Sequence, residues 1–257
     1  MKKYSTYFTR TIILLVFVFY STIGIIAQHY KISRIEARRI EITSVFDKNP
    51  DEKALRILKP YKVNIDTMMN HVIGISDSSM TSSRPESLLT NWVADMLMNE
   101  SERYVGFKPD LAVINVGGLR AAMPKGNITK ENIYEIAPFE NALCVVVLTG
   151  YELTQLFHQI AHLGGEGISG AHLLIDKNGE LLAALVGTDD IDPDRRYKIA
   201  TVDYLAEGND GMSAFALSNE HVKPAITLRQ MLLNYVDKFT KQGEHINSKL
   251  DGRIRIK

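Results

Sequence analysis

The spacing of apolar residues predicts both helices and strands along most of the chain. Apolar side chains recur at helical intervals over about 86–102, 151–163 and 227–239. Short apolar runs predict strands at 111–114, 142–148 and 197–202, and a hairpin of 173–175 with 181–186 around Asn178-Gly179. Alternation at 252–256 predicts a closing edge strand. Because helices and strands mix without a regular repeat, we expect an α+β domain with a mixed β-sheet and packed helices.

The segment before this region carries weaker signals. Alternation over 39–43 predicts a strand. Asn49 is expected to cap a helix that has Pro50 at its first position, and Pro60 is expected to kink or split that helix. Farther on, Thr129 is expected to cap a short helix that ends near residue 135.

The N-terminus has the pattern of an export signal. Basic Lys2, Lys3 and Arg10 precede an apolar run over 11–27, which ends in a small residue, Ala27. Residues 1–27 are therefore predicted to be a signal peptide. An uncleaved N-terminal anchor stays open, since about 17 apolar residues approach the length that spans a bilayer. We expect 28–257 to form one domain and the protein to be periplasmic or in the cell envelope.

Composition excludes some classes of partner and chemistry. The formal net charge is +0, which offers no electrostatic argument for a nucleic-acid partner. Cys144 lies inside an apolar strand and is the single cysteine, so no internal disulfide is possible. It is expected to be a buried small hydrophobe and not a nucleophile.

Three segments carry residues suited to binding a small polar molecule with a flat ring. The first reads Asn-Val-Gly-Gly-Leu-Arg over 115–120, the second Pro-Phe-Glu-Asn over 138–141, and the third Asp-Tyr-Leu-Ala-Glu-Gly-Asn-Asp-Gly over 203–211. Glycines permit positive φ angles and close approach of a ligand to the backbone. An arginine can hold a phosphate or vicinal hydroxyls, and aromatic rings can stack on a base.

Together, in this order, the three segments resemble the C-terminal domain of the 5'-nucleotidase family, the secreted or periplasmic enzymes that dephosphorylate nucleotides. The resemblance runs from about residue 40 to the end of the chain. It implies a 5'-nucleotidase C-terminal domain-like fold that binds a nucleotide or nucleoside. The residues that it implicates are Asn115 near the base or ribose, Arg120 at a phosphate or ribose hydroxyls, Phe139 and Tyr204 on either side of the base, Asn141 at the base edge, and Asp210 at the ribose hydroxyls.

The chain departs from the family pattern at three places, one of which is Thr90-Asn91 where the family has Gly-Asn. The arginine expected three residues before Glu86 is replaced by Ser83, and Arg84 stands one position away, restricted to extended geometry by Pro85. Arg84 is kept as a weak candidate for phosphate binding. The second glycine of the third segment is Asn209, which tolerates left-handed backbone better than most residues.

Family members normally carry an N-terminal metallophosphatase domain that binds two metal ions and performs hydrolysis. No His and Asp residues here are spaced for such a site, and the pair His158 and His162 lacks a base Glu and a third ligand. We therefore expect no catalytic residue, metal ion or other cofactor in this chain.

The resemblance suggests that the chain supplies substrate binding to a separate metallophosphatase subunit, which would hold the divalent metals. It would then be a hydrolase component that is inactive alone. Two alternatives stay open: a non-catalytic exported nucleoside-binding protein, and a structural remnant with an empty pocket.

Overall fold

The computed structural model describes residues 11–17, 32 and 34–257, and the remainder of the predicted signal 1–27 lies outside these ranges. Residues 11–17 are helical. Within the described ranges, no helix combines the length and the apolar character needed to cross a membrane. The chain divides into two compact units between Leu55 and Arg56, and every named strand belongs to the second unit.

The strand predicted at 39–43 does not form. Those residues have no regular structure, and a short 3-10 helix, η1 (Ser44–Lys48), follows them. None of the residues in η1 is buried. Alternating side chains need a neighbouring strand and a core to bury one face, and this segment has no strand partner among the described residues.

Helix α2 (Glu52–Met69) also differs from its predicted form. It begins after Asp51, whose Oδ1 accepts hydrogen bonds from the backbone amides of Lys53 and Ala54 at 2.8 and 3.1 Å. The predicted cap at Asn49 was therefore two residues too early. The predicted split at Pro60 was also wrong, because the helix continues through it, and a kink there stays a prediction. Loss of a single amide donor has not ended α2, none of whose residues is buried.

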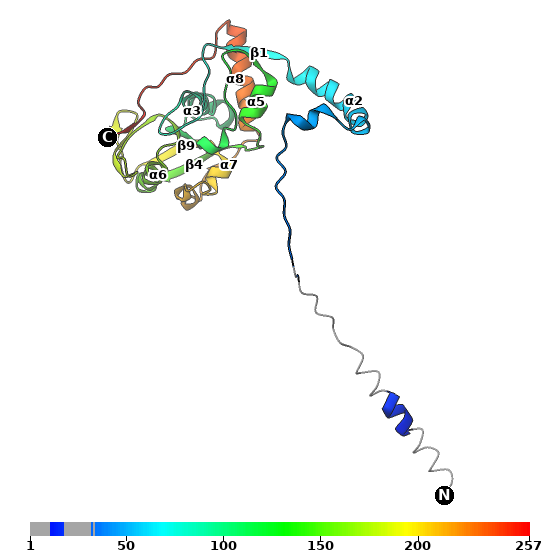
Figure 1. The fold of residues 1–257 in the computed structure, drawn as a ribbon. Helices are drawn as coiled ribbons and strands as arrows, with labels where there is room; N and C mark the ends of the chain where they lie inside the picture. Colours follow the sequence, from blue (N-terminus) through cyan, green and yellow to red (C-terminus); the bar gives the residue numbers. More distant parts are fainter. Residues whose placement is uncertain (1–10, 18–31, 33) are drawn as a thin grey trace. The chain divides into compact units, whose positions relative to one another are not determined.

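The main sheet of the second unit has five strands in the order β10-β4-β9-β2-β5. Its neighbouring strands β4 and β9 are labelled in Figure 1. Strands β2 and β9 are parallel, and the other neighbours are antiparallel, so the expected mixed sheet is confirmed. The strands are β2 (Leu111–Ile114), β4 (Leu143–Thr149), β5 (Gly167–Ser169), β9 (Arg196–Val202) and β10 (His221–Val222).

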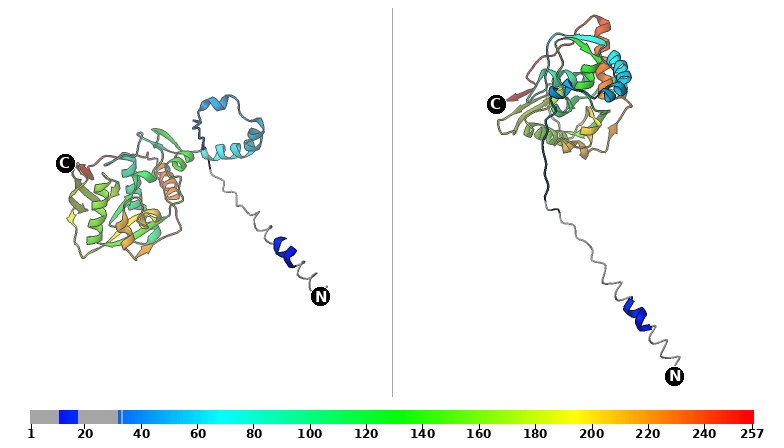
Figure 2. Two further views of the ribbon diagram at one scale, coloured as in Figure 1. Left: turned by 60° about the horizontal axis from the view of Figure 1, so that its bottom comes forward. Right: turned by 45° about the vertical axis from the view of Figure 1, so that its right-hand side comes forward.

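Two smaller sheets complete the second unit. One pairs β1 (Val72–Ser76) with β3 (Gly126–Thr129). The other has the order β11-β6-β7-β8, with β11 at its edge beside the C-terminus (Figure 2). It contains the predicted hairpin, as β6 (Ala171–Ile175) and β7 (Leu181–Val186), and the predicted closing strand, as β11 (Ile254–Ile256). Its fourth strand, β8 (Asp189–Asp190), was not predicted.

Helix starts in this unit follow local capping chemistry. The side chains of Thr129 and Thr149 each form a capping box with the third helical residue, and Ser87 and Thr227 each accept a bond from a first-turn amide. The helices are α3 (Leu88–Glu100), α4 (Glu102–Val105), α5 (Lys130–Ile136), α6 (Gly150–His162), α7 (Asp203–Ala206) and α8 (Leu228–Gln242), with 3-10 turns η2 (Val116–Gly118) and η3 (Ser213–Leu217).

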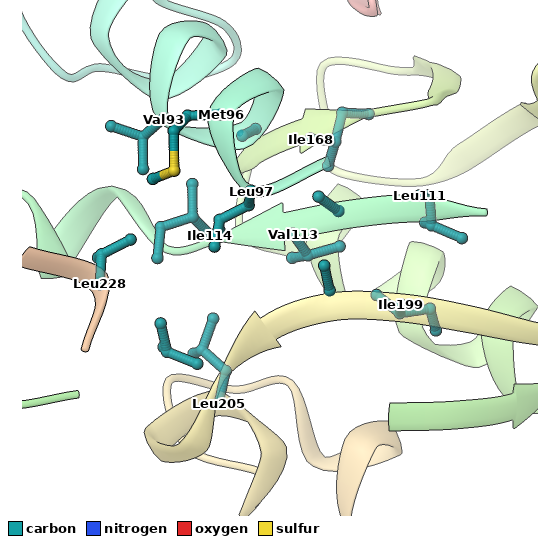
Figure 3. Packing of buried hydrophobic residues seen from close by; sticks show 14 of the residues in the cluster. Val93, Met96, Leu97, Leu111, Val113, Ile114, Ile168, Ile199, Leu205 and Leu228 are labelled. Carbon is teal, nitrogen blue, oxygen red and sulfur yellow. The ribbon is translucent and has the colours of Figure 1, made fainter. Parts of the chain in front are cut away.

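The buried core includes residues of α3, α6, α8 and the main sheet. Val93, Met96 and Leu97 of α3 gather beside Ile114 of β2 (Figure 3). Cys144 is buried in β4, and burial raises the pKa of its thiol to about 11. This agrees with its expected role as a small apolar residue.

Burial predicts a sharp contrast between two aliphatic side chains. Leu97 is fully buried, so Leu97→Ala should lower the free energy of unfolding by about 2–5 kcal/mol. Ile65 on α2 is 54% exposed, and Ile65→Ala should change it by less than about 0.5 kcal/mol. Urea denaturation of both variants measures this difference, and equal losses of unfolding free energy would contradict the exposure of Ile65.

Candidate functional site

Sheet topology brings the three predicted segments to one edge of the main sheet. Asn115 directly follows β2, and Asp203 directly follows β9. Because these strands are parallel, their carboxyl ends meet at the same edge. Leu143, the first residue of antiparallel β4, pairs with Val202 at the end of β9, so the segment before β4 reaches the same edge. Three loops far apart in sequence therefore meet there.

A cleft of about 370 Å³ opens between these loops. Six of the seven predicted site residues line it, and the two glycines of the first segment complete the lining. The lining residues are Asn115, Gly117, Gly118, Arg120, Phe139, Asn141, Tyr204 and Asp210. The volume lies in the range of ordinary small-ligand pockets.

Two aromatic side chains expose apolar surface at this cleft. Phe139 is 48% exposed and Tyr204 is 39% exposed, although large rings are usually more buried. The Tyr204 hydroxyl donates a 2.8 Å hydrogen bond to Asp210 Oδ1, and this bond raises the pKa of Tyr204. Exposed rings from different loops around one cleft suit contact with a flat ligand.

Asp210 is the centre of a small polar network. Its Oδ2 accepts a 2.5 Å bond from Asn115 Nδ2, while its Oδ1 accepts from Tyr204. Asp210 has a φ of 53°, a left-handed conformation that Asp adopts more readily than most residues. Asn209, which could tolerate a left-handed backbone, does not have a positive φ. Its Nδ2 donates to the Tyr204 carbonyl at 2.8 Å.

The glycine pair has a different purpose from the one that the sequence suggested. Neither Gly117 nor Gly118 has a positive φ. A Cβ atom at Gly118 would lie 2.6 Å from Asn115 Oδ1, whereas at Gly117 the nearest atom would be 3.6 Å away. Gly118 therefore leaves room for the Asn115 amide. Within the described chain, the buried Asn115 Oδ1 accepts no hydrogen bond.

Arg120 keeps its charge available at the cleft. Its Nη1 donates to the Gly117 carbonyl at 3.3 Å, and among the described residues it forms no ion pair with a carboxylate. The backbone amide of Arg120 donates to the Ile136 carbonyl at 2.9 Å, which joins the first loop to the end of α5. An exposed guanidinium without an internal counterion is suited to an anionic or hydroxyl-rich ligand.

Arg84 lies outside the residues that line the cleft. Its Nε donates to the Gly165 carbonyl at 2.9 Å, and its Nη2 pairs with buried Glu166. Glu166 also accepts a 2.5 Å bond from the Val116 amide, inside the first loop. Arg84 is thus linked to this loop through Glu166. Its contact with a phosphate stays a prediction.

Glu166 is the residue that sequence reasoning missed. Burial raises its pKa, while the Val116 amide and the Arg84 guanidinium oppose that shift. The available signal was a carboxylate between Gly165 and Gly167, where no solvated helix face would explain it.

Metal chemistry finds no support in the described residues. Among them, no three His, Cys, Asp or Glu side chains group closely enough to hold a metal ion. His158 and His162 both lie exposed on α6. The residues present therefore do not fit a metal centre, and the independence of this chain from metals stays a prediction.

Comparison with known families agrees with this geometry. The model of the family described as "5'-nucleotidase, C-terminal domain" matches residues 65–217. The chain belongs to this family. The match covers all three segments that border the cleft, and in the related nucleotidases this domain is the C-terminal part of a longer chain.

Relatives and solved structures place the domain in longer proteins. The chain is 27% identical over 235 residues to the trifunctional nucleotide phosphoesterase protein YfkN of Bacillus subtilis, covering 81% of this chain and 15% of YfkN. It is 27% identical over 235 residues to the cell wall protein Lmo0130 of Listeria monocytogenes, covering 79% and 29%. The 5'-nucleotidase precursor of Thermus thermophilus shares the fold, with a TM-score of 0.69 at 24% identity over 79% and 43% of the two chains.

The two adjacent glycines give a matched test of the site's packing. Gly118→Ala should lower the free energy of unfolding by about 1–3 kcal/mol, because the new methyl group overlaps Asn115 Oδ1. Gly117→Ala should change it by less than about 1 kcal/mol, since its methyl group meets only ordinary contacts. Chemical denaturation measures both, and a larger loss at Gly117 would contradict this packing.

Proposed function

We propose that this domain binds a nucleotide or nucleoside in the cleft between its three loops. It supplies substrate binding for nucleotide dephosphorylation by a separate metallophosphatase chain. The observation that carries the proposal is the convergence of two exposed rings, a carboxylate, and an arginine that has no carboxylate partner in the described part of the chain, around one cleft of about 370 Å³. This combination matches the base, phosphate and ribose of one ligand.

Each part of the ligand has a suitable contact. Phe139 and Tyr204 stack on the base, a contact that tolerates different bases because each has a π-face. Asn141 bonds the base edge. Arg120 holds phosphate or hydroxyl oxygens with its planar fork, and Asp210 accepts bonds from ribose hydroxyls.

Division of the reaction between two chains is supported by what this chain offers. Hydrolysis by a metal-activated water requires a ligand set, and the described residues contain none that fits. The partner chain would provide the metal ions and the attacking water.

Helix α2 offers a surface for that partner. Leu58, Tyr61, Ile65 and Met68 recur at helical spacing on one face, and each is more than half exposed. Exposed apolar surface of this kind marks protein interaction sites. We include this face in the proposal as the contact for the metallophosphatase chain.

Export of the protein fits its relatives. Lmo0130 is a cell wall protein, and the apolar run over 11–27 has the pattern of an export signal or anchor. We place the domain in the periplasm or the cell envelope, where extracellular nucleotides are its ligands.

A second candidate function is nucleoside capture without catalysis. The observation that favours it is the ion pair of Arg84 with Glu166, which occupies the second arginine near the cleft. A site with Arg120 alone is less specialised for a phosphate than one with two free arginines. Affinities for adenosine and its 5'-monophosphate therefore separate the two functions.

Calorimetry with adenosine tests the binding site directly. Phe139→Ala should weaken binding by roughly 1–3 kcal/mol, the contribution of one base–aromatic stack. Tyr151→Ala is the matched control, because Tyr151 is an exposed aromatic on α6 outside the cleft lining, and its loss should leave affinity unchanged. No binding of adenosine or its monophosphate by the unmodified protein would defeat the proposal.

Activity assays test the division between two chains. The purified protein should not release phosphate from nucleotides with added divalent metals, because the described residues provide no fitting ligand set. Metal-dependent turnover by contaminant-free protein at typical enzyme rates, roughly 1–1000 per second, would show that it is a complete enzyme. Adenosine monophosphate with Mg²⁺, Mn²⁺, Zn²⁺ or Co²⁺ serves as the assay mixture.

A further inference from the structure

We propose that Arg229 is a positioning residue that fixes the orientation of Phe139 for stacking on the base. This inference rests on the proposed function, since it concerns the same cleft. Arg229 is not among the residues that line the cleft, and it lies beyond the matched range 65–217. It is the second residue of α8, an element that belongs to none of the three segments.

The guanidinium of Arg229 contacts the chain on both sides of Phe139. Its Nη1 donates to the carbonyl oxygens of Ala137 and Pro138 at 3.2 and 3.1 Å. Its Nη2 forms an ion pair with Glu140, the residue that follows Phe139. The Arg229 side chain is only 11% exposed, so these contacts are made largely away from solvent.

The guanidinium of Arg229 also lies over an aromatic ring. The Arg229 Cζ atom lies 4.4 Å from the centroid of Tyr134, a residue of α5. An arginine can stack on this ring and donate several hydrogen bonds from its edge at the same time. A lysine at this position would keep the charge but lose the planar fork.

Other hydrogen bonds hold the two ends of the loop over 136–141, which carries Phe139, but not its middle. At one end, the Arg120 amide bonds to the Ile136 carbonyl at 2.9 Å. At the other, the Leu228 amide bonds to the Asn141 carbonyl at 2.9 Å. In the described part of the chain, the bond from Arg229 to the Pro138 carbonyl is the only hydrogen bond to the backbone of 138–140.

The consequence for binding follows from preorganisation. Phe139 is half exposed at the cleft. A loop that must be ordered when the ligand arrives reduces affinity, and a loop ordered beforehand does not. Arg229 therefore affects the part of the ligand that Phe139 touches, the base, and not the part held by Arg120 and Asp210.

Calorimetry of Arg229→Lys with two ligands tests this role. Affinity for adenosine should fall about five- to tenfold, whereas affinity for ribose 5-phosphate, which has no base, should stay within about twofold. Glu140→Gln is the matched control, because it removes only the ion pair with a 74% exposed side chain and keeps both carbonyl bonds. Its affinities should stay within about twofold, as for other exposed pairs.

A double-variant cycle gives the same answer without the second ligand. When Phe139→Ala is already present, adding Arg229→Lys should not weaken adenosine binding further, because the two residues act through one contact. Independent, additive losses would overturn the positioning role.

The outcomes separate this inference from the proposed function. If the unmodified protein binds adenosine and Arg229→Lys binds it with the same affinity, the positioning role is overturned and the proposed function stands. Equal loss for adenosine and ribose 5-phosphate, with a lower melting temperature, shows a general structural role and also overturns it. Absence of adenosine binding by the unmodified protein overturns the proposed function and the positioning role together.

Discussion

The register of three neighbouring strands is the constraint on which the site depends. Leu111 of β2 pairs with Ile199 of β9, and Leu143 of β4 pairs with Val202 at the end of β9. A slip of one residue would turn every side chain of a strand to the opposite face, and because consecutive residues of these strands are buried, it would disturb the packing on both faces. Since these strands are largely apolar and buried, the core determines the register, and the register brings the three loops together.

The site built on this sheet has a buried part and an exposed part. In the buried part, Glu166 links Arg84 to the Val116 amide, and Asn115 bonds to Asp210. The bonded Glu166 carboxylate rigidifies the first loop, because a buried polar group with satisfied bonds restricts motion. In the exposed part, the rings of Phe139 and Tyr204 border the cleft. A ligand can therefore approach the exposed rings while the backbone beneath them stays in place.

Local signals in the sequence predicted much of the fold, including the capped helix after Thr129, the hairpin at Asn178-Gly179 and the mixed sheet. They also identified six residues that line the cleft, although their binding roles stay predictions. The failures have physical causes. The predicted strand at 39–43 has no partner strand among the described residues. Glu166 and Arg229 act through partners that are 82 and 91 residues away in sequence, which no local pattern indicates.

The bond between Tyr204 and Asp210 joins the aromatic and polar parts of the cleft. An ionised carboxylate has about four sites for accepting hydrogen bonds, and Asn115 and Tyr204 each occupy one. Sites therefore remain for ribose hydroxyls in the proposed complex without loss of either internal bond. A phenylalanine at position 204 could stack on a base but could not be held by Asp210. Because one carboxylate holds the ring and also has free acceptor sites, recognition of the base and recognition of the ribose would be physically coupled in the proposed complex.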